Sequence, residues 1–346
     1  MRALTISAHG GFEQLQVRTD LPVPELRAGD DVRVRVRAAA LNHLDLFVLR
    51  GLPGASITPP WIMGADAAGE IDAVGPAVQG LAPGDRVVIN PGISDRTCEY
   101  CRDGEQSLCV RYKLLGEHLP GTIADYVVVP AANVRPIPAS TPWDVAAALP
   151  LATLTAWRMV VTRAQVRVGD TVLIWGIGGG VAAAALQVAK LQGATVWVTS
   201  GSEAKLERAR ALGADATFNH LSQDVAGEVR ARTGKRGVDV VIDDVGQATW
   251  TQSLKALGKR GRLVTCGATS GPMVETDLRR LFWNQWTIMG STMGNDREFD
   301  AVLRAFAAGA LAPPLDSVFD ITSARAAFER LASGEQFGKI VIRVSD

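Results

Sequence analysis

A glycine-rich turn at residues 176–180 has the composition of a phosphate-binding loop. Apolar, β-branched residues precede it at 171–175 and an alanine-rich stretch follows at 181–191, which predicts a strand, a turn and a helix. Gly178, Gly180 and Ala183 have the G-x-G-x-x-G/A spacing. Glycine lets the backbone approach a pyrophosphate, and the helix N-terminus supplies free N–H groups. The turn indicates a dinucleotide site, and the alternative is a tight strand–helix turn that binds no nucleotide.

The end of the next predicted strand, 195–199, bears on which dinucleotide is bound. An NAD enzyme places an acid about 20 residues after the glycines, where it bonds the ribose 2′-hydroxyl. Here the strand runs into Ser200 and Ser202, and Lys205 follows one helical turn later. Small hydroxyls and a cation suit a 2′-phosphate and favour NADPH over NADH. Glu203 argues against this choice, and Lys205 could simply be an exposed charge on a helix.

Three of the four cysteines are clustered as Cys98, Cys101 and Cys109. Thiolates at such spacings are typical zinc ligands. A redox-active Cys98–Cys101 pair is the alternative, but no thioredoxin-like pattern follows it. Four cysteines in 346 residues exclude a disulfide scaffold.

The elements that must position these residues differ between the two parts of the chain. Up to residue 137, short apolar runs at 32–37, 67–74, 86–89 and 126–129 alternate with turn signals. Residues 32–37 alternate valine with arginine, as a half-buried strand does. This spacing of short strands predicts a small barrel or sandwich.

After about residue 140 the pattern becomes an alternation of strands and helices, which predicts βαβ units and a parallel sheet. The predicted strands are 171–175, 195–199, 216–218, 238–242, 263–266 and 287–289, and the helices between them are 181–191, 202–211 and 224–233. Residues 294–346 contain two short helices and a final strand at 339–344, which we expect to return to the first domain. The predicted domains are therefore 1–137 with 294–346, and 138–293.

Charge and hydropathy exclude several classes of protein. Lys and Arg total 36 and Asp and Glu total 36, so the net charge of zero gives no basic footprint for a nucleic acid or a polybasic membrane anchor. The most apolar stretch, 145–161, is broken by Pro150 and Arg158 and is not a membrane-spanning helix. No targeting segment is evident at the N-terminus, so a cytoplasmic location is expected.

Motifs along essentially the whole chain resemble those of the medium-chain dehydrogenase/reductase superfamily, which includes zinc alcohol dehydrogenases and quinone oxidoreductases. The matching stretches are 42–45 (NHLD), 63–66 (MGAD) continuing to Gly75, 83–87 (PGDRV), 121–126, 154–157 (LTAW), the glycine loop, 211–215 (ALGAD) and 338–339 (GK). The loop has the length of the quinone-reductase branch, with Ala182 in place of its last glycine. The resemblance implies an α/β protein with a GroES-like β-barrel catalytic domain and a doubly wound Rossmann domain.

The resemblance also implies a structural zinc in a lobe spanning 91–112. The family pattern is C-x2-C-x2-C-x7-C, and counting back from Cys98 places Asp95 at the first ligand position. A carboxylate is an accepted zinc ligand, so Asp95, Cys98, Cys101 and Cys109 form the expected set. A vestigial lobe without metal is the alternative.

The family's catalytic zinc, by contrast, lacks its ligands in this sequence. The matching positions hold Asn42, Ala65 and Leu151, and the last two side chains cannot ligate a metal. His43 and Asp66 are offset by one position from ligands, so a rewired site stays an alternative. Without zinc, nothing polarises an alcohol or carbonyl as a Lewis acid, which argues against ordinary alcohol dehydrogenase chemistry.

Metal-free relatives reduce activated C=C bonds, where a hydrogen-bond donor to the developing enolate suffices. Asn42 is the candidate donor to the substrate oxygen or the nicotinamide ribose, and Asp45 is expected to orient Asn42 or His43. Each could instead have a structural role, in a turn or a helix cap. Phe47 replaces a tyrosine of some relatives, so the proton donor is left unassigned.

Residues that match cofactor-binding positions of the family are assigned by the same resemblance. Thr155 and Val245 are expected near the nicotinamide, and Lys339 near the pyrophosphate. The remaining candidates are Gly179, Gly180 and Val181 at the pyrophosphate, Ser200 and Lys205 at the 2′-phosphate, His220 beside the adenosine phosphate, and Gly267, Ala268 and Ser291 at later strand ends.

These observations lead to one main hypothesis and two alternatives. The main hypothesis is an NADPH-dependent reductase of an electron-poor C=C bond or a quinone that works without a catalytic zinc. The alternatives are an alcohol or aldehyde oxidoreductase with an altered metal site, and a low-turnover dinucleotide-binding sensor. The substrate is a small molecule that no motif identifies. The resemblance implies a homodimer or homotetramer formed through the strand at 287–289.

Overall fold

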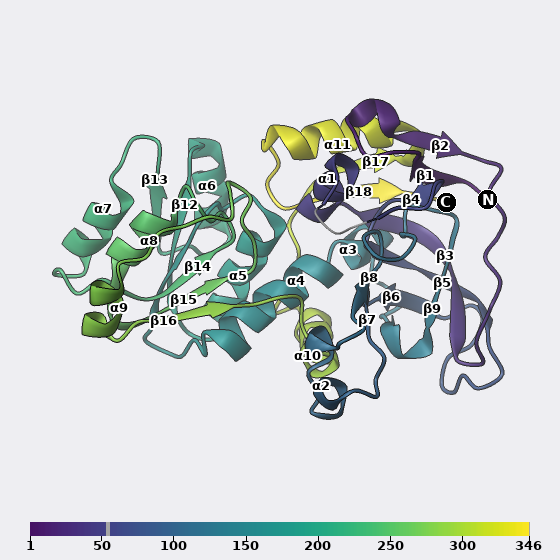
Figure 1. Ribbon diagram of the computed structural model, residues 1–346, viewed down its shortest axis with the longest axis horizontal. Coiled ribbons are helices and arrows are strands. Elements are labelled where there is room, and N and C mark those ends of the chain that lie inside the picture. The colour runs from purple at the N-terminus through teal and green to yellow at the C-terminus, as the bar shows by residue number, and fades with distance from the viewer. Residues whose placement is uncertain (53–55, 346) are drawn as a thin grey trace. The chain divides into compact units, whose positions relative to one another are not determined.

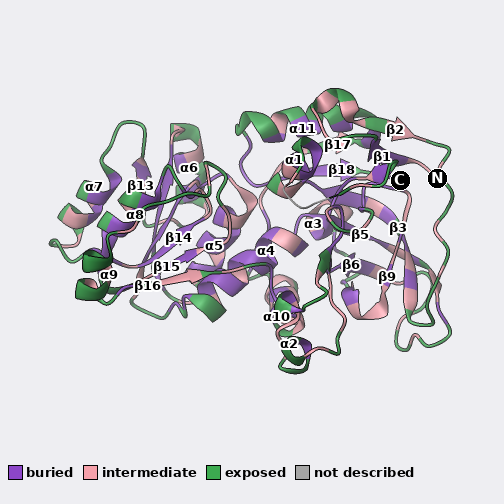
Figure 2. Ribbon diagram, in the orientation of Figure 1, coloured by how far each residue is buried: buried purple, intermediate pink, exposed green. Residues whose placement is uncertain are grey.

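The computed structural model describes residues 1–52 and 56–345, which fold into two units (Figure 1). One unit contains Met1–Ala152 together with the chain from Asn295 onward, and the other contains Thr153–Gly294. Each unit has its own apolar core, and Figure 2 shows the strands of both sheets as mostly buried. Among the described residues, no helix combines the length and the apolar character needed to cross a bilayer.

The first unit is built around a seven-stranded sheet in the order β10-β6-β5-β3-β18-β17, with β9 also paired to β3. Its strands are β3 (Asp31–Ala40), β5 (Asp66–Val74), β6 (Arg86–Ile89), β9 (Tyr126–Pro130), β10 (Val134–Pro136), β17 (Leu315–Asp320) and β18 (Lys339–Arg343). A three-stranded sheet contains β1 (Ala3–Ile6), β2 (Gln16–Arg18) and β4 (Trp61–Ile62), and a hairpin-like pair contains β7 (Gly92–Ile93) and β8 (Lys113–Leu114).

Strand β3 organises this unit because it pairs with three others, β5, β9 and β18. Its alternation is the predicted one: Val32, Val34 and Val36 are fully buried, whereas the arginines between them lie on the outer face. The pairing with β18 brings the last strand of the chain beside one of the first. Residues more than 250 positions apart therefore share one core.

The first unit extends further along the chain than the sequence predicted. The first boundary falls after Ala152 and not after residue 137, and the second falls after Gly294. Helix α3 (Trp143–Ala147) accounts for the difference, since it packs on β3 and β5. Arg86 stacks over the ring of Trp143, with its guanidinium carbon 3.4 Å from the ring centroid. A composition change in the sequence marked the end of the β-rich region but not the helix that covers it.

The second unit contains a six-stranded, wholly parallel sheet in the order β13-β12-β11-β14-β15-β16. The strands are β11 (Thr171–Ile174), β12 (Thr195–Ser200), β13 (Ala216–Asn219), β14 (Val238–Asp243), β15 (Leu257–Thr265) and β16 (Thr287–Gly290). With β11 as the first strand, the order is 3-2-1-4-5-6, the doubly wound arrangement of dinucleotide-binding folds. The predicted parallel sheet is confirmed.

Helices connect the strands of this sheet as crossovers. They are α5 (Gly180–Leu191), α6 (Glu203–Ala211), α7 (Val225–Arg232), α8 (Trp250–Ala256) and α9 (Leu278–Asn284). Helix α4 (Pro150–Trp157) leads into the unit. The first unit additionally holds α1 (His43–Arg50), α2 (Glu99–Arg102), α10 (Asp296–Ala307) and α11 (Ala324–Ser333).

Candidate functional site

The glycine loop leads from β11 into α5 with the backbone geometry of a phosphate-binding turn. Gly176 and Gly178 have φ of +67° and +135°, conformations that favour glycine. Gly179 is the N-cap of α5 and supplies no side-chain cap. A Cβ placed on Gly179 would meet only one atom, the carbonyl oxygen of Gly176 at 3.8 Å. The first-turn N–H groups of α5, from Gly180 and Val181 among others, have no acceptor within the helix and are the groups that can bind an anion.

The end of β12 carries the residues expected at the 2′-phosphate. Ser200 accepts a hydrogen bond from the amide of Ser202 at 3.1 Å, and Ser202 caps α6 by accepting from the amide of Lys205 at 3.4 Å. The acid that opposed the NADPH prediction, Glu203, accepts a hydrogen bond from the side-chain amide of Asn219 at 2.6 Å. Glu203, at the start of α6, is thus bonded to the last residue of β13. This bond occupies the one nearby acid that could have bound a ribose hydroxyl.

His220 lies immediately after β13, beside these residues. Its ring packs against Trp175, with centroids 6.2 Å apart, and its Nδ1 lies 3.4 Å from the hydroxyl of Thr199. Burial lowers the pKa of His220. The ring is therefore neutral at physiological pH and offers a flat, apolar face with one polar edge.

The other predicted cofactor residues of this unit follow the carboxyl ends of β14, β15 and β16, except for Thr155, which lies in α4. Val245 donates its amide to the carboxylate of Asp243, and Thr155 lies 3.8 Å from the sulfur of Met293. Because all strands are parallel, their carboxyl ends share one edge of the sheet, where ligands of such folds bind. A cavity of about 290 Å³ at this edge is lined by Gly267, Ala268 and Ser291 together with Cys266.

Lys339 is the one predicted cofactor residue that does not lie in the second unit. It begins β18 of the first unit, and its side chain is only 4% exposed. Its ammonium nitrogen lies 2.5 Å from Oδ1 of Asn42 and 3.0 Å from Oδ2 of Asp66. Both partners belong to its own unit, and a contact of Lys339 with the pyrophosphate stays a prediction.

Asn42 and Asp45 form a reciprocal capping box at the start of α1. The amide of Asn42 donates to Oδ2 of Asp45 at 2.7 Å. Burial raises the pKa of Asp45 to about 7, against the opposing effects of the Asn42 amide and Lys339. The Asn42 side chain donates from Nδ2 to Oδ2 of Asp66 at 2.9 Å. Asn42 is thus both the cap of α1 and part of a buried polar cluster.

Asp66 is the residue of this cluster that the sequence did not assign a role. Its Oδ1 accepts the backbone amide of Leu151 at 2.8 Å, while Oδ2 accepts from Asn42 and Lys339. Three segments that are far apart in sequence thus meet on one fully buried carboxylate. The MGAD motif contains Asp66, but only the fold gives it these partners.

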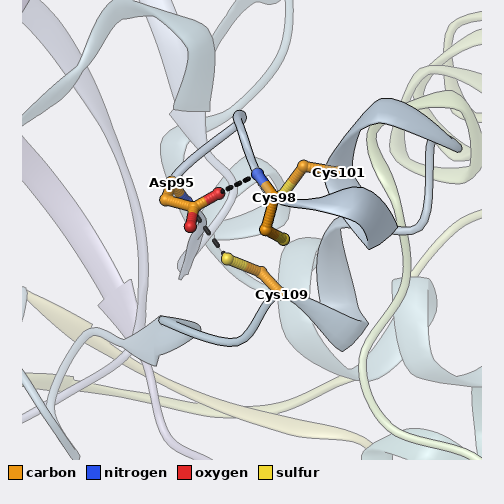
Figure 3. A group of neighbouring side chains, drawn as sticks. All are labelled: Asp95, Cys98, Cys101 and Cys109. Atoms are coloured by element: carbon orange, nitrogen blue, oxygen red, sulfur yellow. Dashed lines mark hydrogen bonds between the residues drawn. The ribbon is translucent and has the colours of Figure 1, made fainter.

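The four predicted metal ligands converge in the lobe that follows β7 (Figure 3). One ligand atom from each of Asp95, Cys98, Cys101 and Cys109 can be chosen so that all lie within 4.8 Å of one another. Within residues 1–52 and 56–345, this is the only group of three or more His, Cys, Asp or Glu side chains with such spacing. Local turns create it, because Oδ1 of Asp95 accepts the amides of Thr97 and Cys98, both at 2.9 Å.

The electrostatics of the lobe favour a bound cation. The amides of Cys98 and Thr97 hold the pKa of the Asp95 carboxyl well below its usual range. Its other oxygen, Oδ2, is buried and has no hydrogen-bond partner in the described chain. The Nε of Arg111 lies 3.2 Å away without hydrogen-bond geometry, on a side chain that is 74% exposed. An orphaned carboxylate oxygen beside three sulfurs fits a tetrahedral zinc site.

Comparisons with known proteins match both units of the chain to dehydrogenases. Residues 28–139 match the family described as an alcohol dehydrogenase GroES-like domain, and residues 180–308 match zinc-binding dehydrogenase. The NAD-dependent alcohol dehydrogenase of Sulfolobus acidocaldarius is 32% identical over 356 residues, covering 100% of both chains. The chain belongs to the medium-chain dehydrogenase/reductase superfamily of zinc-type alcohol dehydrogenases. It is therefore an oxidoreductase.

Two further relatives place the chain within this superfamily. A crystal structure titled NAD-dependent alcohol dehydrogenase has a TM-score of 0.95 and 47% identity, with 100% of each chain covered. The acryloyl-coenzyme A reductase of Metallosphaera sedula is 31% identical over 345 residues, covering 99% of each chain. Both alcohol dehydrogenases and a C=C reductase are thus among the relatives. The superfamily and the two-domain fold predicted from the sequence are confirmed.

Proposed function

We propose that this protein is an NADPH-dependent oxidoreductase that transfers hydride to an electron-poor C=C bond or a quinone without a catalytic zinc. The observation that carries the proposal is the donor set at positions 42, 65 and 151. These hold an amide, a methyl group and an isobutyl group, and the neighbouring Asp66 is already bonded to three partners from its own unit. Such a set lacks the thiolates and imidazoles that hold zinc.

The chemistry suits an acceptor that needs no Lewis acid. Bound nicotinamide supplies the hydride, and the chain contributes binding, orientation and electrostatics. A conjugated C=C bond or a quinone is already electron-poor, so preorganised polar groups suffice to stabilise the charge that develops on its oxygen. Oxidation of an alcohol, by contrast, requires the hydroxyl to lose a proton, and a bound metal ion helps by lowering the pKa of that hydroxyl. The acryloyl-coenzyme A reductase relative fits this assignment.

The cofactor proposal rests on the residues at the carboxyl ends of β11 and β12. The free N–H groups in the first turn of α5, after the loop that ends at Gly179, would receive the pyrophosphate of a dinucleotide. Ser200 and Lys205 would recognise a 2′-phosphate, and the hydrogen bond between Asn219 and Glu203 supports this choice because it occupies the competing acid. The side chain of His220 would lie beside the adenosine phosphate, and Thr155 and Val245 beside the nicotinamide.

The zinc proposal concerns only the lobe around Asp95. Asp95, Cys98, Cys101 and Cys109 would hold one ion per chain, and the ion would close the lobe rather than take part in hydride transfer. Bonds between the lobe and α10 give it a structural setting: Arg96 pairs with Asp296 at 2.7 Å, and the amide of Asp296 donates to Gln106 at 3.3 Å.

A homodimer or homotetramer is proposed through β16. Within the described residues, β16 pairs only with β15 and so leaves one edge of the sheet open. Helix α9 beside it in sequence exposes Leu278, Phe282 and Trp283, each more than 60% accessible. Light scattering on the purified protein measures the mass, and F282K/W283K is expected to reduce it to that of a monomer.

The decisive test follows NADPH oxidation with quinones, enones, enoyl thioesters and aldehydes, before and after chelator treatment. We expect chelator-resistant turnover of the first three classes, with NADPH clearly preferred to NADH. K205A should raise the KM for NADPH about tenfold and leave that for NADH unchanged, as loss of a charged contact does. S200D is the matched opposite, because a carboxylate there should repel the 2′-phosphate and favour NADH.

An NAD-dependent alcohol dehydrogenase is the second candidate, favoured by the names of two relatives. It predicts aldehyde or alcohol turnover with NADH or NAD that a chelator abolishes without unfolding the protein. That outcome would overturn the zinc-independent proposal and point to a rewired metal site. Tight NADPH binding with no turnover of any acceptor would favour the sensor alternative.

A further inference from the structure

An acidic side chain with no assigned role stands at the carboxyl edge of the parallel sheet in the second unit. Asp244 is the first residue after β14, the strand that pairs with β11 on the side away from β12. In a sheet of order 3-2-1-4-5-6, a dinucleotide binds outside the carboxyl ends of the strands, where the strand order reverses. That point lies between β11 and β14, so Asp244 borders the place where such a ligand is expected.

The contacts of Asp244 place its carboxyl beside the glycine loop. Its Oδ1 would lie 4.0 Å from a Cβ built on Gly176, the first glycine of that loop. The backbone carbonyl of Asp244 accepts the amide of Thr269 at 3.3 Å, which connects it to the turn after β15. A Cβ on Gly267 in that turn would lie 3.1 Å from the same carbonyl oxygen. Asp244 is thus held between the turns that follow β11 and β15.

The two successive acids at the end of β14 differ in their partners. Asp243 is fully buried, and its carboxylate accepts two backbone amides and the hydroxyls of Thr249 and Ser253 in α8. Asp244 is half-buried, and within residues 1–52 and 56–345 no other residue bonds its carboxyl or pairs with it. The chain satisfies the first acid and leaves the hydrogen-bonding capacity of the second for a ligand or water.

The surroundings of Asp244 make an unpartnered carboxyl costly. Burial and, to a lesser degree, the negative charge of Asp243 raise its pKa to about 7. Withdrawing a carboxylate from water without a hydrogen bond or a cation destabilises the folded state. Perturbed ionisable groups of this kind are concentrated at functional sites. Because Asp243 shows that this edge can satisfy an acid from within the chain, the lack of partners at Asp244 points to a ligand.

The chemistry of the edge indicates which part of a dinucleotide Asp244 would meet. A pyrophosphate needs donors, which the first turn of α5 supplies, and an ionised acid would repel it. The adenosine half is expected on the other side of the loop, at Ser200 and His220 after β12 and β13. The nicotinamide half is then left for the side of β14, and its ribose carries two hydroxyls. A hydroxyl both donates and accepts, so it can bond a carboxyl in either protonation state.

We propose that the Asp244 carboxyl binds the hydroxyls of the nicotinamide ribose and thereby fixes that half of the dinucleotide at the end of β14. The inference rests on the dinucleotide binding in the proposed function, and it does not depend on which acceptor is reduced. It gives the second ribose an acid, whereas the end of β12 lacks the usual ribose-binding acid. Every residue that it invokes lies in the second unit.

The first test measures binding and needs no turnover. Isothermal titration gives the Kd of wild type and D244L for NADP⁺ and for adenosine 2′,5′-bisphosphate, which lacks the nicotinamide half. For D244L we expect the Kd for NADP⁺ to rise about 10- to 100-fold, as on loss of hydrogen bonds to a charged group. The Kd for the bisphosphate should stay within about twofold. D244N keeps polar atoms that can bond a hydroxyl and should lose less affinity than D244L.

A modified ligand tests the same contact without changing the protein. NADP⁺ with a 2′,3′-dideoxyribose in its nicotinamide half lacks both hydroxyls. Wild type should bind this analogue about tenfold or more weakly than NADP⁺, and D244L should bind the two to within about twofold. If D244L still discriminates between them as wild type does, the hydroxyls bond another group and the proposal is overturned.

Asp239 provides a matched control on the same strand. It lies near the other end of β14, its side chain is 24% exposed, and it pairs with Arg236 at 2.5 Å. D239L removes an acid of the same size and should leave both Kd values unchanged. If D244L, shown to be folded by circular dichroism, weakens NADP⁺ and the bisphosphate equally, Asp244 supports the glycine loop and the proposal is overturned. Unchanged affinity for NADP⁺ in D244L would overturn it too.

The design separates failure of this proposal from failure of the proposed function. If wild type binds NAD⁺ more tightly than NADP⁺, the choice of cofactor is wrong, and NAD⁺ and ADP take the place of the two ligands in the same comparison. If no acceptor is reduced in the turnover assay, the Kd values still decide the role of Asp244. If wild type binds neither dinucleotide, both proposals are wrong.

Discussion

The metal lobe around Asp95 and the buried cluster of Lys339, Asn42 and Asp66, called the lysine cluster, lie in the same unit and compensate negative charge in different ways. The lobe brings three sulfurs and a carboxylate within 4.8 Å and leaves one carboxylate oxygen buried without a hydrogen bond. In the lysine cluster, both oxygens of Asp66 are bonded and the cation comes from the chain itself. The first cluster has the donor set of a metal site, and in the second the carboxylate is already paired with a lysine of the chain.

The difference teaches how local spacing and distant packing build two kinds of charged cluster. Soft thiolates held by tight local turns keep their affinity for zinc wherever the lobe is packed. In a site assembled from distant segments, the partners of each charged side chain depend on which segments pack together. Local spacing does not determine them. The buried Asp66 is paired in this way with Lys339, which lies 273 residues later in the chain.

The largest effect should come from emptying the metal lobe. C101S removes one thiolate and is expected to abolish the zinc, near one ion per chain in wild type, and to lower the free energy of unfolding by more than about 5 kcal/mol, since structural zinc contributes about 10–16 kcal/mol in zinc-finger peptides. Metal analysis and urea unfolding measure both. C266S, a cysteine outside the lobe, should keep its zinc. Equal zinc content in C101S and wild type would refute the assigned ligand set.

Breaking the lysine cluster should cost less and leave the zinc in place. K339M strands the buried Asp66 carboxylate, which is expected to cost about 3–5 kcal/mol, the usual range when one partner of a buried pair is removed. The double variant K339M/D66N should recover part of this loss, because the unpaired charge is gone. Urea unfolding of the single and double variants gives the coupling energy, and simple additivity would show that the two groups do not interact.

Asp45 should make the stability of the first unit depend on pH. Its folded pKa of about 7 lies above the unfolded value of 3.8, so the folded state holds the proton more tightly. Stability is therefore highest below pH 3.8 with respect to this group and is lost as pH rises to about 7, by at most about 4 kcal/mol. Asp244 has the same pH dependence, because burial and, to a lesser degree, the charge of Asp243 raise its pKa to about 7. The measurement is therefore the difference in stability between wild type and D45N, in which the contribution of Asp244 cancels. A difference that stays constant from pH 4.5 to 8 would contradict the prediction.

The smallest effect should come from an ion pair of the same chemistry on the surface. K190M breaks the Lys190–Asp215 pair, whose side chains are 34% and 38% exposed. Solvent and salt weaken such pairs, so the expected loss is about 0.2–1 kcal/mol. Unfolding in low and high salt measures it. A loss as large as that of K339M would mean that burial is not what distinguishes the lysine cluster.

The sequence by itself determined the features that depend on local spacing. Alternating valines predicted β3, the succession of strands and helices predicted the parallel sheet, and the glycine turn marked the start of α5. The cysteine spacing placed Cys98, Cys101 and Cys109 in one lobe, and a family pattern added Asp95. These signals work because a turn, a helix start or a short metal loop is built from residues a few positions apart.

Only the tertiary structure decided what depends on distant segments. The first domain boundary moved to Ala152 because α3 packs on β3 and β5, which no local pattern encodes. The ammonium of Lys339 meets Asn42, 297 residues earlier in the chain, and Asp66, 273 residues earlier, and the sequence predicted neither contact. A buried charge takes the partners that packing brings within reach, and a sequence does not state which distant residues those are.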